Sequence, residues 1–356
     1  MGKNILAEKI SEEVFVYLKE LSLLKAELSD IKSLTNMSVS NIICSVIFGQ
    51  RFQFDDQQFK KIIGLFGILS EYSDVFNIVN IIPSLIYLPF DFFGAKKALN
   101  ATNELQRNSE LMVEKIGKEL NPENVDNFIV AYIQAMKKKE KSGQPTHLSY
   151  ENLARCIDDL FVAGTETTST TILWCLLYSI HHPDLQEKVY QEILEKVGTE
   201  RAPNMMDKQN LKYLIAFIME TQRIASLFPF TLYDCLADTK FETYTIPKGT
   251  KIISNLDSVL RSKNIWGDPE IFRPERFIDG DGNLQIPDEF IPFSMGRRAC
   301  LGESLAKMEL YLYMASLFQK FKFLPEDENN LPSLQGTVGI TSSPFPYRLR
   351  ATERLH

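Results

Sequence analysis

One loop near the C-terminal end of this sequence combines a cysteine with residues that could make it a ligand. The stretch FSMGRRACLG places Cys300 between Gly296 and Gly302, directly before an apolar helical segment. The free N–H groups and partial positive charge of a helix N-terminus stabilise a thiolate, the form of cysteine that ligates a metal or attacks carbon. The two glycines allow tight turns and the close approach of a planar ligand.

Two further side chains of this loop support the same chemistry. Arg298 can direct its planar guanidinium to an anionic group of the ligand. Phe293 can shield the sulfur from water, which tunes the potential of a bound metal. A lone cysteine is more often an inert, buried side chain, but these neighbours together favour a thiolate that ligates a metal.

A second chemical feature is a polar interruption of an apolar helical segment. Residues 163–171 read AGTETTSTT, with Gly164 and the lone carboxylate Glu166 among five threonines. Glycine costs about 1 kcal/mol relative to alanine inside a helix. Threonine hydroxyls can bond back to the carbonyl four residues earlier and open a local groove. We expect a flat ligand to approach the helix at the glycine, and Glu166 with Thr167 to pass protons to whatever is bound there.

The same segment could instead be a transmembrane helix. Glu166 is the one charged residue between Leu160 and His182. The many hydroxyl groups argue against a simple lipid-facing span.

Helices must position both features, and the apolar spacing predicts them. Helical spacing runs from the N-cap Ser149 to His182, before Pro183. The N-terminal third is mostly helical, with one apolar segment, residues 39–48, ending at Gly49. Further helices are expected at residues 185–197, at 211–226 and after residue 300; short strands at 243–246 and 250–255, joined across 247–249; and extended segments at 321–324 and 336–349.

Composition excludes several classes of protein. The chain has 356 residues with ordinary globular composition and a net charge of −7, which argues against general nucleic-acid binding. The five cysteines form no C-x-x-C pair and the four histidines no H-E-x-x-H motif, so neither a zinc site nor a disulfide framework is expected. Residues 75–90 carry no charge, but Asn and Pro residues interrupt the apolar run. This pattern indicates an apolar surface or lid segment.

At this point the loop resembles the heme-binding signature of the cytochrome P-450 superfamily, F-x-x-G-x-R-x-C-x-G. Every defined position is filled, by Phe293, Gly296, Arg298, Cys300 and Gly302. Three other motifs of that family occur in family order: A-G-x-[DE]-T-[TS] at residues 163–168, E-x-x-R at Glu220 and Arg223, and the segment at residues 274–277 whose Arg276 completes an ion-pair cluster. The segments at 246–250 and 290–294 resemble the microsomal, drug- and steroid-oxidising branch.

The resemblance implies a cofactor and roles for the loop and the helix. The cofactor would be heme b, with Cys300 as the axial thiolate of the iron and Arg298 paired with a propionate. Glu166 and Thr167 would be the catalytic residues that deliver protons to bound oxygen. The heme-binding residues would be Ala163, Gly164, Phe293, Gly296, Arg298, Cys300, Leu301 and Gly302.

The resemblance also implies a fold and partners. The fold would be mainly α with small β-sheets, a single cytochrome P-450 domain over residues 1–356 that lacks the N-terminal anchor, first strands and first helices. The activity would be monooxygenation of a small lipophilic substrate with O2 and electrons from an NADPH-dependent flavoprotein reductase. Arg297 and Lys307 are candidates for the basic footprint of that reductase. The location would be the cytosolic face of the endoplasmic reticulum membrane, with peripheral membrane contact and no nucleic-acid partner.

The substrate would lie along the same helix. We expect it to contact Phe161, Val162, Ala163 and Thr168, with an apolar wall from residues 227–232 and Ile340.

Other hypotheses remain open. A truncated, non-catalytic remnant unable to hold heme stably would keep the same motifs. A cysteine-nucleophile hydrolase would need a base, and none of the four histidines lies in a recognisable triad. An isomerase or dehydratase of the same family would rearrange peroxides without O2, which the intact Glu166 and Thr167 argue against.

Overall fold

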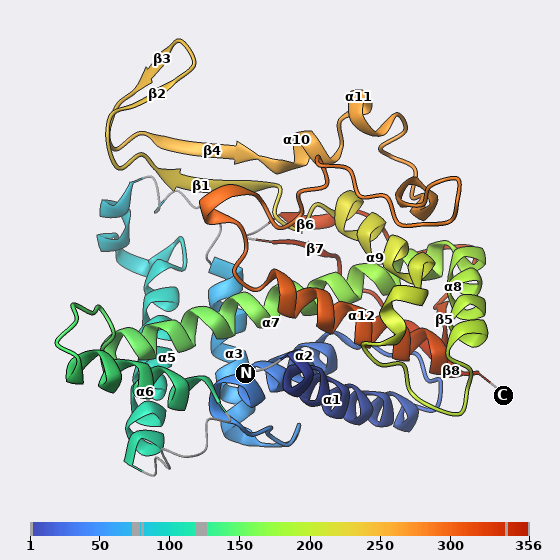
Figure 1. Ribbon diagram of the computed structural model, residues 1–356, viewed down its shortest axis with the longest axis horizontal. Coiled ribbons are helices and arrows are strands. Elements are labelled where there is room, and N and C mark those ends of the chain that lie inside the picture. Colours follow the sequence, from blue (N-terminus) through green and yellow to red (C-terminus); the bar gives the residue numbers. More distant parts are fainter. Residues whose placement is uncertain (1–2, 73–78, 80–81, 119–126, 339–340, 355–356) are drawn as a thin grey trace.

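The computed structural model describes residues 3–72, 79, 82–118, 127–338 and 341–354, and helices make up most of this part (Figure 1). The mainly helical fold expected from the sequence is confirmed. The α-helices are α1 (Lys3–Leu23), α2 (Lys32–Phe48), α3 (Gln57–Tyr72), α5 (Ala95–Lys118), α6 (Phe128–Lys141), α7 (Tyr150–His181), α8 (Pro183–Lys196), α9 (Lys212–Ala225), α10 (Leu256–Leu260), α11 (Lys263–Trp266) and α12 (Glu303–Lys320).

Short antiparallel strand pairs lie around the helices. They are β1 (Phe230–Asp234) with β4 (Lys251–Asn255), β2 (Thr239–Phe241) with β3 (Tyr244–Ile246), β5 (Phe321–Pro325) with β8 (Leu349–Glu353), and β6 (Gly336–Val338) with β7 (Ser342–Pro344). The expected strands at 243–246 and 250–255 exist, but they do not pair with each other. The turn at 247–249 carries the chain from one two-stranded pair to another.

The long helix α7 crosses the centre of the molecule, as Figure 1 shows. It begins where the sequence predicts, because the Ser149 hydroxyl accepts a hydrogen bond from the Asn152 N–H at 3.1 Å. It ends before Pro183, which opens α8. Every residue from 168 to 180 is buried, so this half of the helix forms the core.

The core explains why α7 passes for a membrane helix by composition. Within the described residues it alone has the length and apolar character to cross a bilayer, yet two thirds of its most apolar window is buried inside the protein. It packs against α2, α5 and α12, with α1 behind α2 and α12. The structure therefore places α7 as the central helix of a protein core.

The ion-pair cluster expected from the sequence is present and buried. Glu220 of α9 accepts from Arg223 Nε at 2.8 Å and from Arg276 Nε at 2.9 Å. Neither Glu220 nor Arg223 has exposed surface. Other N–H groups of the Arg223 guanidinium donate to the carbonyls of Leu260 and Pro269, so the cluster joins α9 to the end of α10 and to the segment after α11.

The apolar segment at 75–90 lies partly outside the described residues, namely at 75–78, 80 and 81. Its described end forms two short 3-10 turns, Pro83–Tyr87 and Pro89–Asp91. Aromatic side chains are exposed there: Tyr87 is 85% exposed, Phe90 86% and Phe92 71%. The expectation of an apolar surface segment is confirmed for these residues.

Candidate functional site

Backbone turns and one backbone hydrogen bond shape the cysteine loop, residues 293–302. A 3-10 turn, Gly296–Arg298, follows Met295, and Gly296 has a φ of 75°, a conformation that favours glycine. The Cys300 N–H donates to the Phe293 carbonyl at 2.9 Å and closes the loop. The thiol then lies three residues before α12, whose first helical residue is Glu303. The expected position of Cys300 near a helix N-terminus is confirmed.

The same loop turns its reactive groups outward. Cys300 is exposed and Leu301 is 93% exposed. Arg298 is also exposed and makes no hydrogen bond or ion pair within the described part of the chain. Its side chain joins Met295 and Arg297 along an open surface hollow that Tyr233 of β1 borders. An exposed thiol next to an unpaired guanidinium is a donor set that suits a planar, anionic ligand with a metal centre.

A polar face of α7 provides the second part of the site. Asp159, Ala163 and Thr167 are four residues apart and share one side of the helix. Asp159 and Ala163 are exposed, and Thr167 is half-buried, although the helix is central. The Thr167 hydroxyl donates to the Ala163 carbonyl at 2.7 Å, and Thr171 bonds the Thr167 carbonyl in the same way at 2.8 Å. The predicted back-bonding of the threonines is thus confirmed, and Asp159 is an exposed acid on the same side of the helix that the sequence motifs do not include.

Glu166 lies next to this face and is half-buried. Its Oε1 accepts a hydrogen bond from the Thr170 hydroxyl at 3.4 Å, and no described cation pairs with it. This carboxylate keeps partial contact with solvent.

Gly164 also has a packing role. A Cβ at this position would lie 2.5 Å from Ile43 Cδ1 of α2. The glycine therefore allows α7 and α2 to pack closely. It follows Ala163 by about 100° around the helix, and its contact with a flat ligand stays a prediction.

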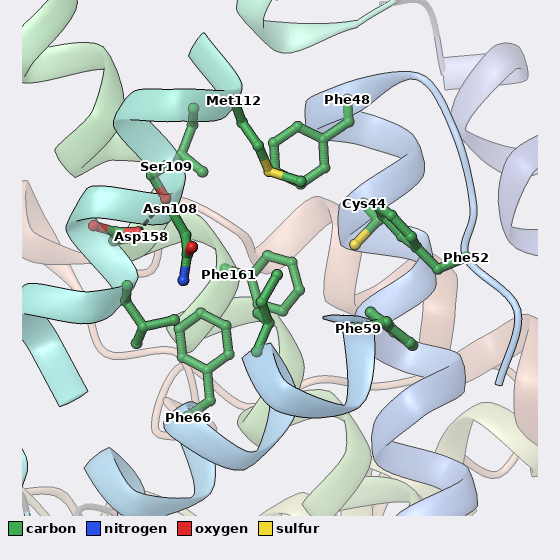
Figure 2. Close-up of a pocket in the computed structure, with 13 residues that line it drawn as sticks. Cys44, Phe48, Phe52, Phe59, Phe66, Asn108, Ser109, Met112, Asp158 and Phe161 are labelled. Carbon is green, nitrogen blue, oxygen red and sulfur yellow. Dashed lines mark hydrogen bonds between the residues drawn. The ribbon is translucent and has the colours of Figure 1, made fainter. Parts of the chain in front are cut away.

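Two residues expected to contact substrate also face the core. Phe161 is 3% exposed and stacks on Phe66 of α3 with ring centroids 4.6 Å apart. Figure 2 shows Phe161 directed into a pocket that Cys44, Phe48 and Phe66 also line. Thr168 is 2% exposed and donates to Glu309 of α12 at 2.9 Å. Of the other expected contacts, Val162 is half-buried and Ile340 lies outside the described residues.

The contact between Thr168 and Glu309 brings the two parts of the site together. Thr168 follows Thr167, and Glu309 is six residues into α12, about 9 Å along the helix from its start. Leu305 of α12 packs against the apolar cluster that contains Phe161. The cysteine loop is thereby anchored beside the middle of α7. Glu309 was not expected from the motifs, although a lone acidic residue in the apolar run MELYLYMA is a visible signal.

The fold and the site together define the class of protein. A family model for cytochrome P450 matches residues 2–351, and the chain belongs to this family. Membership implies a heme cofactor, and the exposed thiol, the unpaired Arg298 and the exposed Ala163 face fit such a group.

Curated relatives agree with this assignment. Cytochrome P450 2U1 of Homo sapiens is 41% identical over 363 residues, which cover 99% of this chain and 65% of the relative. Cytochrome P450 2J2 of Homo sapiens is 36% identical over 100% of this chain and 70% of its own length. Cytochrome P450 2C23 of Rattus norvegicus is 36% identical over 98% of this chain and 71% of its own. The chain thus spans just under two thirds of the human 2U1 relative.

Proposed function

We propose that the protein is a heme-thiolate monooxygenase that inserts one oxygen atom from O2 into a small lipophilic substrate, with electrons from an NADPH-dependent flavoprotein reductase. The observation that carries the proposal is the exposed Cys300 thiol, in a loop that leads into α12, a helix that packs against α7. When bound, heme b would supply the activation of O2 that a thiolate ligand favours.

Residues of the cysteine loop would hold the heme. Cys300 would ligate the iron and Arg298, which has no described partner, would pair with a propionate. Gly296 and Gly302 would leave room for the group, and exposed Leu301 and half-buried Phe293 would contact it. Ala163, a small exposed residue of α7, would also contact it.

The polar residues of α7 would manage protons. The Thr167 hydroxyl gives its hydrogen to the Ala163 carbonyl, so its oxygen can accept a hydrogen bond from a group bound above Ala163. Glu166 lies beside it with partial exposure and would carry protons in from solvent. Asp159, on the same side of the helix as Ala163 and Thr167, would hold water where the protons enter from solvent.

A basic surface near the cysteine loop supports the reductase as partner. Arg297 is exposed and has no described partner. Lys307 pairs with Glu303 at 2.6 Å, so it contributes less free charge than the sequence indicates. Burial and the charge of Lys307 lower the pKa of Lys208, which places a third cation nearby. We propose this surface, led by Arg297, as the docking site for an acidic flavoprotein.

The exposed aromatic residues support a membrane location. Tyr87, Phe90 and Phe92 form an apolar patch between α3 and α5. Aromatic side chains with this exposure suit the interface of a bilayer. We propose peripheral contact with the endoplasmic reticulum membrane, with the enzyme on the cytosolic face.

Uncoupling by Thr167→Ala tests the proposed chemistry. The protein is reconstituted with reductase, NADPH and a panel of lipophilic substrates, and oxidised product and hydrogen peroxide are measured. The wild type is expected to yield product that carries oxygen from O2. Thr167→Ala should keep its heme but release several times more peroxide per NADPH, because the hydroxyl that guides protons is lost. Equal coupling in both proteins would remove Thr167 from the mechanism.

A further inference from the structure

Glu309 is a fully buried acid that the proposed chemistry does not use. It is 1% exposed and lies between α12 and α7. Its Oε2 accepts from the Thr168 hydroxyl at 2.9 Å, and its Oε1 has no hydrogen-bond partner in the described structure. An ionised carboxylate offers about four acceptor sites, so one hydrogen bond leaves it badly solvated.

No cation in the described part of the chain pairs with this carboxyl. Burial raises the pKa of Glu309 to about 8, and the hydrogen bond from Thr168 opposes this only in part. Tyr313 of α12 feels the charge of Glu309 together with those of Glu13 and Tyr17 of α1. Arg51 is paired with Glu13 at 2.9 Å. The neutral acid is therefore the form that fits the site at neutral pH.

We propose that Glu309 is a positioning residue that acts as a neutral acid: its protonated carboxyl keeps Thr168, and with it the Ala163–Thr167 stretch of α7, in place against α12. Thr168 directly follows Thr167, and the two hydroxyls bond different partners: Thr168 donates to Glu309 and Thr167 to the Ala163 carbonyl. Ionisation would leave a buried charge with one hydrogen bond, so the contact between α7 and α12 must open to admit water. The polar face of α7 would then shift relative to the cysteine loop.

Infrared spectroscopy tests the protonation of Glu309 without any activity. At pH 7 exposed acids are ionised, so a difference spectrum between the wild type and Glu309→Gln should show the C=O band of one protonated carboxyl. The band should disappear as the pH rises through about 8. Glu303→Gln, an exposed acid on the same helix, should leave the band in place. Absence of the band at pH 6 to 7 would overturn the proposal.

The pH dependence of stability gives a second readout. The unfolded carboxyl releases its proton near pH 4.5 and the folded one near 8, so the folded state binds the extra proton between these values. The unfolding equilibrium constant of the wild type relative to Glu309→Gln should rise up to about tenfold per pH unit across this window. Thermal unfolding of both full-length chains from pH 5 to 9 measures the difference. A constant difference in melting temperature would contradict a neutral buried acid.

Coupling separates a positioning role from mere stability, and this arm alone rests on the proposed function. At pH 7 Glu309→Gln should match the wild type, because its carbonyl can still accept from Thr168. At pH 9 the wild type should release severalfold more peroxide per NADPH, whereas Glu309→Gln should not. Thr168→Val, which removes the hydroxyl but keeps the shape, should uncouple at both pH values. Identical pH profiles for the wild type and Glu309→Gln would refute positioning, even if the infrared band is present. Loss of heme would instead count against the proposed function.

Discussion

Glu220 has no exposed surface, yet it accepts hydrogen bonds from both Arg223 and Arg276. The arginines are in turn satisfied by carbonyls and by Asp268, so the cluster leaves little polar capacity unused. Glu309 is as deeply buried but has one partner, a hydroxyl. At the scale of single residues, the contrast separates two states of a buried carboxyl, one paired with two guanidinium groups and one with no described counter-charge.

Removal of Glu220 tests the first of these two states. Glu220→Ala should lower the free energy of unfolding by about 3–5 kcal/mol, because two buried guanidinium groups lose their counter-charge. The yield of folded protein and its melting temperature measure the effect. Glu151→Ala, which breaks an exposed pair with Arg155, is the control and should melt almost like the wild type. Similar losses in both variants would contradict a buried cluster.

At the scale of elements, two faces of α7 have different surroundings. One face exposes Ala163 and leaves Thr167 half-buried, and another places Gly164 against Ile43 of α2. The helix motif A-G-x-E-T-T therefore combines site residues with a packing residue. Sequence spacing could identify the motif but could not separate its site residues from its packing residue. The direction of each side chain depends on which helices surround α7.

A double-mutant cycle tests the packing role of Gly164. Gly164→Ala alone gains about 1 kcal/mol in helix propensity but places a methyl group against Ile43 Cδ1, where overpacking costs about 1–3 kcal/mol. Ile43→Val removes the Cδ1 methyl group of Ile43. In this background Gly164→Ala should be at least about 1 kcal/mol more favourable than in the wild type. Additive changes in unfolding free energy would show that Gly164 and Ile43 are not in contact.

At the scale of the whole molecule, local patterns predicted elements better than their partners. The ends of α7 followed from Ser149 and Pro183, and the C-terminus of α2 from Gly49, which takes a left-handed conformation. The pairing of β3 with β2, and of β4 with β1, did not follow, because registers between short strands are set by tertiary contacts. The burial of Phe161 and Thr168 did not follow either, because it depends on which helices surround α7.

The exposed aromatic patch leads to a prediction for membranes. Replacing Phe90 and Phe92 by serine should reduce binding of the protein to phospholipid vesicles severalfold, because two largely exposed apolar rings are lost. Vesicle sedimentation measures the bound fraction. Phe241→Ser, at a 62% exposed position on the β2–β3 hairpin, is the control and should bind like the wild type. Equal losses in both variants would place the contact elsewhere or make it nonspecific.

The absorption spectrum of the reduced, carbon-monoxide-bound protein tests the central claim most directly. The position of its main band separates thiolate-ligated heme from histidine-ligated or absent heme. We expect the thiolate type for the wild type, because Cys300 is exposed at the loop that Gly296 and the Phe293 carbonyl shape. Cys300→Ser should lose the thiolate-type band. Cys156→Ser, at a half-buried cysteine of α7, should keep it. A thiolate-type spectrum that survives in Cys300→Ser would contradict the account.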